Sequence, residues 1–195
     1  MPIALLVFFA TFFALAFFWP TFRLWRRDGV NALVLPYDDT AYGLVGKWFR
    51  ATLIAVFALL IALSLGLPDR VLGQLRWLEQ SALQKAGWAL LILSLVWIVA
   101  AQAQMGASWR IGIDKDTPTP LVTRGIFARS RNPIFLGMRA SLLGLLLVLP
   151  SGMTLAIFLL GEVLMQVQVR LEETHLLGLH GNSFEQYRQS VRRWF

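Results

Sequence analysis

The sequence predicts an all-α polytopic membrane protein with five transmembrane helices and a cytoplasmic C-terminal amphipathic helix. Hydrophobic residues make up 57% of the chain and charged residues only 15%, whereas soluble domains have about 45–50% apolar and about 25% charged residues. The apolar residues collect in long runs, and the basic residues flank these runs. This arrangement is typical of a chain that is partly dissolved in lipid.

The first three runs predict three N-terminal transmembrane helices within residues 1–104. The run at 2–22 is uncharged and lacks a basic n-region and a small-residue cleavage site, so we expect a retained anchor rather than a signal peptide. The run at 48–67 stops at a Pro-Asp pair. The run at 82–104 tolerates Lys85 near its start, where a long side chain can reach the interface.

The last two runs, 134–149 and 153–169, predict a tight helical hairpin. Each is short for a full crossing, which needs about 20 residues, and only "PSG" separates them. Arg139 and Glu162 lie at nearly equal distances in sequence from Ser151 in this turn. Because charges within a membrane normally find a partner, we predict a contact between Arg139 and Glu162.

The distribution of basic residues predicts the orientation. An outside N-terminus places three polar segments in the cytoplasm, at 23–47, 105–133 and 170–195. These segments and their flanks hold all 18 Lys and Arg residues except Arg70, Arg76 and Lys85, in agreement with the positive-inside rule. We expect an integral protein of a bacterial inner membrane, with a cytoplasmic C-terminus. The net charge of +7 then reflects the bilayer as partner, not nucleic acid.

Several kinds of chemistry find no support in the sequence. The chain has no cysteine, and His175 and His180 lie in a polar tail at an unsuitable spacing, so we expect no metal site. No glycine-rich turn follows a strand pattern, and the P-loop and nucleophile-elbow patterns are absent. We therefore predict no catalytic side chain of these types and a single membrane domain over residues 1–195.

Polar residues gather instead where the predicted hairpin meets the cytoplasm. Asn132 and Pro133 form a sharp helix entry, whose first N–H groups are available to a ligand. Arg131 adds positive charge, and Glu172 and Glu173 follow the last run. Adjacent helical residues point about 100° apart, so the two glutamates should have separate roles. Taken alone, the two glutamates are better explained as solvated residues at a helix end.

The segments "LVTRGIFARSRNPIFLG" and "VRLEETHLLGLHGNSFEQYRQSVRRW" together resemble the isoprenylcysteine carboxyl methyltransferase family of integral membrane enzymes, which is related to phospholipid methyltransferases. The resemblance covers residues 105–195 and implies that this part is a methyltransferase core that binds S-adenosylmethionine. It also implies a lipid-like, membrane-partitioned acceptor, either a lipophilic small molecule or a prenylated substrate.

Residue by residue, the resemblance implies ten cofactor-binding positions: Pro120, Leu121, Val122, Phe127, Arg131, Asn132, Pro133, Phe135, Glu172 and Glu173. Glu172 matches the glutamate that holds the amino-acid end of the cofactor. Phe127 and Phe135 replace tyrosines of the family pattern, and Asn132 replaces a histidine. On the substrate side the resemblance points to Gln168 and Arg170; prenylcysteine enzymes have arginine at the position of Gln168, which puts that substrate in doubt.

Other features leave alternatives open. Gln102, Gln104, Gln166 and Gln168 lie near the inner helix ends, where they could line the meeting point of cofactor and substrate or bond helices together. The C-terminal "GNSFEQYRQSVRRWF" predicts an amphipathic helix that lies on the inner membrane surface or caps the pocket, with arginines that meet lipid phosphates rather than substrate. An NADPH-dependent membrane reductase of the sterol-reductase type and a small non-catalytic transporter remain alternative functions.

Overall fold

The computed structural model describes residues 1–29, 32–34, 38–112 and 119–195, and these are mostly helical. The α-helices are α1 (Pro2–Phe13), α2 (Trp19–Asp28), α3 (Ala41–Ser64), α4 (Ser81–Met105), α5 (Pro133–Val148), α6 (Gly152–His180) and α7 (Asn182–Ser190). Within the described residues, four 3₁₀ helices lie in the connections, at Asp69–Leu72, Arg76–Leu78, Gly106–Ser108 and Gly125–Ala128. The same part of the chain has two short strands, β1 (Leu33–Val34) and β2 (Ile111–Gly112), which pair in parallel.

Four helical segments in the described part of the chain are long and apolar enough to cross a bilayer. They are Pro2–Arg27, Ala41–Ser64, Ser81–Ser108 and Gly152–His180, while α5 is also apolar but shorter. Large apolar side chains such as Ile54, Leu93 and Val163 are exposed on these helices. Since such surface is unfavourable in water, it belongs against lipid, and the protein is an integral membrane protein.

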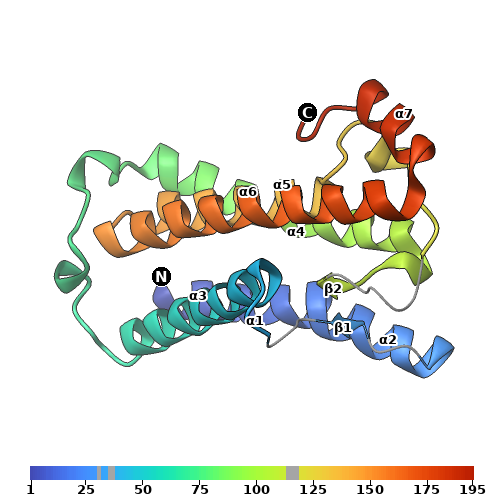
Figure 1. The fold of residues 1–195 in the computed structure, drawn as a ribbon. Helices are drawn as coiled ribbons and strands as arrows, with labels where there is room; N and C mark the ends of the chain where they lie inside the picture. Colours follow the sequence, from blue (N-terminus) through green and yellow to red (C-terminus); the bar gives the residue numbers. More distant parts are fainter. Residues whose placement is uncertain (30–31, 35–37, 113–118) are drawn as a thin grey trace.

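Helices α1 to α6 lie roughly parallel or antiparallel to one another (Figure 1). α1 packs against α3, α3 against α6, and α5 against both α4 and α6. The β1–β2 pair, α2 and α7 lie at one end of the molecule, and the α3–α4 connection lies at the other (Figure 1). The strand pair joins the connection after α2 to the connection after α4, with Ile111 N donating to Ala32 O at 2.7 Å.

The helix that contains the fifth apolar run is longer than the run itself. The run ends at Val169, but α6 continues to His180 and therefore carries Glu172, Glu173 and both histidines. The reason is that residues 170–180 contain no proline, and the helix ends only at Gly181, which has a φ of +51°. Glu172 and Glu173 thus lie within a helix, which gives their side chains fixed directions.

The first span contains an irregular turn. α1 and α2 are joined by a π-helical stretch, Ala14–Phe18, just before Pro20. Proline has no N–H, so the i→i−4 hydrogen bond that would end on the Ala16 carbonyl is missing. Gln102 Nε2, from α4, donates to that carbonyl at 2.5 Å. The proline therefore explains both the local geometry and a side-chain contact between the first span and α4.

Glycines bring α4 and α5 into close contact. A Cβ placed on Gly137 would lie 2.4 Å from Ile98 Cγ1, and one on Gly144 would lie 2.8 Å from Leu91 Cγ. Without side chains at these positions the helix backbones approach closely, as is common for small residues in membranes. These contacts fix the antiparallel register of the two helices, with Ile98 facing Gly137 and Leu91 facing Gly144.

The predicted contact between Arg139 and Glu162 is confirmed. Arg139 Nε lies 2.6 Å from Glu162 Oε2, joining α5 to α6. Gln166 Nε2 donates to the other carboxylate oxygen of Glu162 at 2.8 Å, and the Arg139 guanidinium lies 4.4 Å from the centre of the Trp194 ring. Neither charge of this pair is left unbalanced among the apolar helices.

The short α5–α6 connection is stabilised by a capping box. Ser151 Oγ accepts from Thr154 N at 3.2 Å, and Thr154 Oγ1 accepts from Ser151 N at 3.1 Å. Two N–H groups at the start of α6 are satisfied in this way. Gly152 N also donates to Gly73 O at 2.7 Å, which attaches the α3–α4 connection to this end of the molecule.

Candidate functional site

One large cavity lies among the helices and reaches the end of the molecule that carries α7. Its volume is about 550 Å³, within the usual range for ligand sites. Apolar residues of α1, α3, α5 and α6 line one part of it, including Phe9, Phe12, Phe13, Val56, Leu142 and Met165. Polar residues line the other part, including Gln102, Ser108, Arg131, Asn132, Gln168, Glu172 and Tyr187. The cavity thus combines a polar region with an apolar wall.

Most of the site residues predicted from the sequence border this cavity. They are Pro120, Leu121, Val122, Phe127, Arg131, Asn132, Pro133, Phe135, Gln168 and Glu172. Two others, Glu173 and Arg170, are not among the residues that line it. The tertiary structure therefore brings together segments separated by about forty residues, and the ligand roles of these residues stay predictions.

The N-terminus of α5 borders the polar part of the cavity. Asn132 is the N-cap residue, but its side chain does not cap the helix; Asn132 Nδ2 donates instead to Glu173 Oε1 at 3.1 Å. Pro133 occupies the first helical position, where its missing N–H costs nothing. The N–H groups of Ile134 and Phe135 follow in the first turn, where no preceding helical carbonyl can accept from them. This turn offers two N–H donors beside the cavity.

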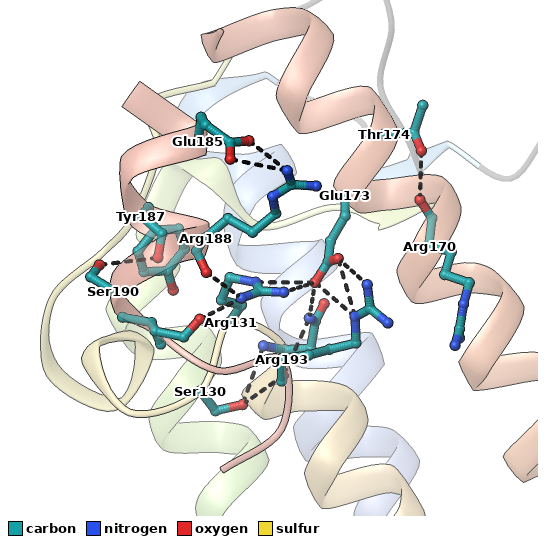
Figure 2. Close-up of polar contacts among 12 residues, drawn as sticks. Ser130, Arg131, Arg170, Glu173, Thr174, Glu185, Tyr187, Arg188, Ser190 and Arg193 are labelled. Carbon is teal, nitrogen blue, oxygen red and sulfur yellow. Dashed lines mark hydrogen bonds and ion pairs between the residues drawn. The ribbon is translucent and has the colours of Figure 1, made fainter. Parts of the chain in front are cut away.

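Glu173 is the centre of a buried cluster of charges (Figure 2). Arg131 donates to Glu173 Oε1 through Nε at 3.1 Å and Nη2 at 3.0 Å. Arg193 donates to Oε2 through Nη2 at 2.7 Å. The prediction that the tail arginines meet lipid phosphates was wrong for Arg193, because its guanidinium turns inward; this hydrogen bond to Glu173 raises the pKa of Arg193 above its usual value.

Arg131 also holds the C-terminal segment, residues 191–195, against the start of α5. Its Nη1 donates to Arg188 O at 2.9 Å and to Val191 O, and its backbone N donates to Arg192 O at 3.0 Å. Ser130 Oγ adds a donor to Arg193 O at 3.3 Å. The segment is thereby fixed beside the Asn132–Pro133 turn and covers the buried cluster.

Glu172 and Glu173 have different surroundings, as their angular separation predicts. Glu172 borders the cavity and accepts from Gln168 Nε2 at 3.2 Å. Arg170 is exposed on another face of α6, where its Nη1 donates to Gln166 Oε1 at 2.9 Å. Figure 2 shows Arg170 apart from the cluster around Glu173. Glu172 is therefore the carboxylate of α6 that a ligand in the cavity can reach.

Tyr187 is a cavity residue that the sequence analysis did not select. It is buried in α7, borders the cavity, and its hydroxyl donates to Phe127 O at 2.6 Å. Burial, together with the nearby Glu173 carboxylate, raises the pKa of Tyr187 to about 12, although the Arg131 charge opposes this. Its spacing from Phe184 had indicated an amphipathic helix that lies on the inner surface or caps the pocket. In the structure Tyr187 of this helix borders the cavity.

Comparison with known proteins assigns the chain to a family. A family model described as phospholipid methyltransferase matches residues 82–183, which is more than half of the chain. The match extends from α4 to the start of α7 and includes the Asn132–Pro133 turn and Glu172. No curated protein matches the chain. The resemblance noted in the sequence is thus confirmed, and the chain belongs to the phospholipid methyltransferase family, a family of membrane methyltransferases.

Proposed function

We propose that the protein transfers a methyl group from S-adenosylmethionine to a lipophilic acceptor that reaches the site from the bilayer. The observation that carries this proposal is the cavity itself. Its polar part contains the residues that the resemblance assigns to the cofactor, and its other part is walled by apolar residues of membrane-spanning helices. The methyltransferase family speaks against an NADPH-dependent reductase or a transporter.

The residues of the polar part fit the chemistry of S-adenosylmethionine. Glu172 offers a carboxylate for the ammonium group, and the N–H groups of Ile134 and Phe135 suit a carboxylate at a helix start. Phe127 and Leu121 supply apolar surface for the adenine ring. When bound, the cofactor supplies a methyl group activated on a positively charged sulfur.

The chain contributes positioning rather than a reactive side chain. Gln168 holds the Glu172 carboxylate through a hydrogen bond of 3.2 Å, and Arg131, bonded to both Glu173 and the C-terminal segment, fixes the turn before α5. A rigid site keeps the acceptor in line with the methyl group at about 3–3.5 Å, which lowers the entropic part of the barrier. Tyr187 and Phe127 close the cavity and exclude water from the reacting groups.

The apolar wall indicates the class of acceptor. A lipid chain can lie against Phe12, Val56 and Leu142 while its head group meets the polar part. The family description favours a phospholipid-like acceptor, and a prenylated acceptor is the alternative. Gln168 stands where prenylcysteine enzymes have an arginine, so the chain lacks at this position the cation that would bind a substrate carboxylate.

We place α5 in the bilayer together with the four longer helices. Its sixteen residues span about 24 Å at 1.5 Å per residue, which is short of a full hydrocarbon core of about 30 Å. Pairing with α6 and the buried Ser151 turn support this arrangement. The basic residues near the cavity end then face the cytoplasm, with the N-terminus outside, as expected for a bacterial inner membrane protein.

Ligand-dependent thermal unfolding of the detergent-purified protein tests the proposal. S-adenosylmethionine and its demethylated product should raise the unfolding temperature, while NADPH should not, because only a ligand of the native state stabilises it. Glu172→Gln removes the charge at constant size and should abolish the shift. Glu79→Gln, at an exposed carboxylate near the start of α4, is the matched control and should keep it.

Transfer of labelled methyl groups from S-adenosylmethionine into a total lipid extract gives the second readout. The extract should become labelled with the wild-type protein and not with Glu172→Gln. A stabilising response to NADPH alone, or equal responses of Glu172→Gln and the control, would contradict the assignment of the site.

A further inference from the structure

Gln102 has a buried acceptor atom for which the described part of the chain supplies no partner. The side chain is 6% exposed and borders the cavity. Its amide nitrogen donates to Ala16 O, which fixes the orientation of the amide because a carbonyl can only accept. The other atom, Oε1, is buried and accepts no hydrogen bond from the described residues. A buried acceptor without a donor is unfavourable, so this one is suited to a ligand that brings a donor.

The register of α4 and α5 places Gln102 beside the polar turn. Ile98 faces Gly137 in this antiparallel pair. Gln102 lies four residues after Ile98, and Pro133 lies four residues before Gly137, so Gln102 and Pro133 are at the same level. The Gln102 side chain thus borders the cavity near the first turn of α5.

The register of α5 and α6 places Gln168 at the same height as Gln102 and Pro133. The Arg139–Glu162 contact sets the antiparallel pairing, and moving six residues along each helix brings Pro133 level with Gln168. Gln168 is bonded to Glu172. Gln102 and Gln168 therefore lie at one height along the helices, and both line the cavity.

We propose that Gln102 selects the methyl acceptor by accepting a hydrogen bond from an N–H or O–H group on the acceptor's reacting head group. This inference rests on the methyltransferase function proposed above. One N–H of the amide nitrogen donates to Ala16 O, and the atom that the described residues leave without a partner is the acceptor Oε1. A neutral amine or a hydroxyl can donate a hydrogen bond to Oε1. A carboxylate has no hydrogen to donate, and its lone pairs would face those of Oε1. Gln102 thus makes the site specific for amine or hydroxyl acceptors over carboxylates.

A series of acceptor lipids in one detergent tests this selection. The probes are phosphatidylethanolamine, its N-methyl and N,N-dimethyl forms, a long-chain alkylphenol and oleate, each with labelled S-adenosylmethionine. Gln102→Met keeps the size of the side chain and removes the acceptor. For acceptors whose neutral reacting group has an N–H or O–H, kcat/KM should fall about three- to tenfold. For the dimethylamine lipid, whose neutral nitrogen has no hydrogen, it should change less than twofold.

Two further variants separate selection from a structural effect. Gln104→Met is the matched control: Gln104 is exposed on the same helix, accepts from Ile126 N at 2.7 Å and does not border the cavity, so its loss should leave the acceptor preference unchanged. Pro20→Ala supplies an N–H for Ala16 O. The double variant Gln102→Met/Pro20→Ala should still show the loss that depends on the acceptor.

Three outcomes overturn the inference: recovery of the wild-type preference in the double variant, equal losses across the whole lipid series, or transfer to oleate alone or to none of the probes. The thermal shift with S-adenosylmethionine is measured in every variant. If one of these outcomes occurs while S-adenosylmethionine still raises the unfolding temperature, only the proposed role of Gln102 is refuted. If S-adenosylmethionine does not raise the unfolding temperature of the wild-type protein, the proposed function itself is refuted.

Discussion

Replacing Glu173 with glutamine tests whether the buried charge cluster holds the C-terminal segment in place. The side chains of Glu173 and Arg131 are each 8% exposed, while that of Arg193 is 31% exposed. Removing one partner of a buried ion pair costs about 3–5 kcal/mol, because the other charge is left uncompensated. We therefore expect Glu173→Gln to lower the free energy of unfolding by about 3 kcal/mol. The more exposed Arg193 should contribute about 1 kcal/mol.

Detergent-solubilised protein allows both effects to be measured by chemical unfolding, with limited proteolysis as a local probe. Glu173→Gln should unfold at lower denaturant concentration and lose residues 191–195 to a protease faster than the wild type. Arg193→Gln should show faster cleavage with a smaller loss of stability. Because both variants disrupt one network, the double variant should be close to Glu173→Gln alone, not to the sum. Wild-type stability and cleavage in Glu173→Gln would refute this account of the cluster.

Two further predictions concern single contacts. Arg139→Met should lower the free energy of unfolding by about 2 kcal/mol, since both side chains of the Arg139–Glu162 pair are about a quarter exposed. Adding Glu162→Met should restore part of this loss in the same unfolding assay. If the double variant instead loses the sum of the two single losses, the two side chains do not form a direct pair. Tyr187→Phe should lose about 1 kcal/mol with the hydrogen bond to Phe127 O. The pKa of Tyr187 is raised from 10.0 to about 12. The stability from its hydroxyl should therefore be fully present below about pH 10 and disappear between about pH 10 and 12. Measuring the free energy of unfolding as a function of pH tests this.

The lengths and flanks of the apolar runs determined the membrane character and the positions of the long helices, while the motifs around Asn132 and Glu172 indicated the family. These features are local: a run of apolar residues can lie in a bilayer wherever its neighbours are. The Arg139–Glu162 contact was also predictable, because a turn at Ser151 leaves little freedom in how the two adjacent helices align. The apolar run by itself does not mark the end of α6, because the helix continues through residues 170–180 and ends only at Gly181.

Tertiary structure decided the site. Asn132 and Glu172 are forty residues apart, and only the packing of α5 on α6 brings both to one cavity. The sequence could not show that Glu173 bonds to Arg131 and Arg193 while Glu172 borders the cavity. The order of two neighbouring residues does not indicate which face of the helix packs against the rest of the protein. The Gln102 acceptor, which has no partner among the described residues, likewise arises from contacts between separate helices. Such contacts depend on helix rotation and register, which composition and spacing leave open and close packing fixes.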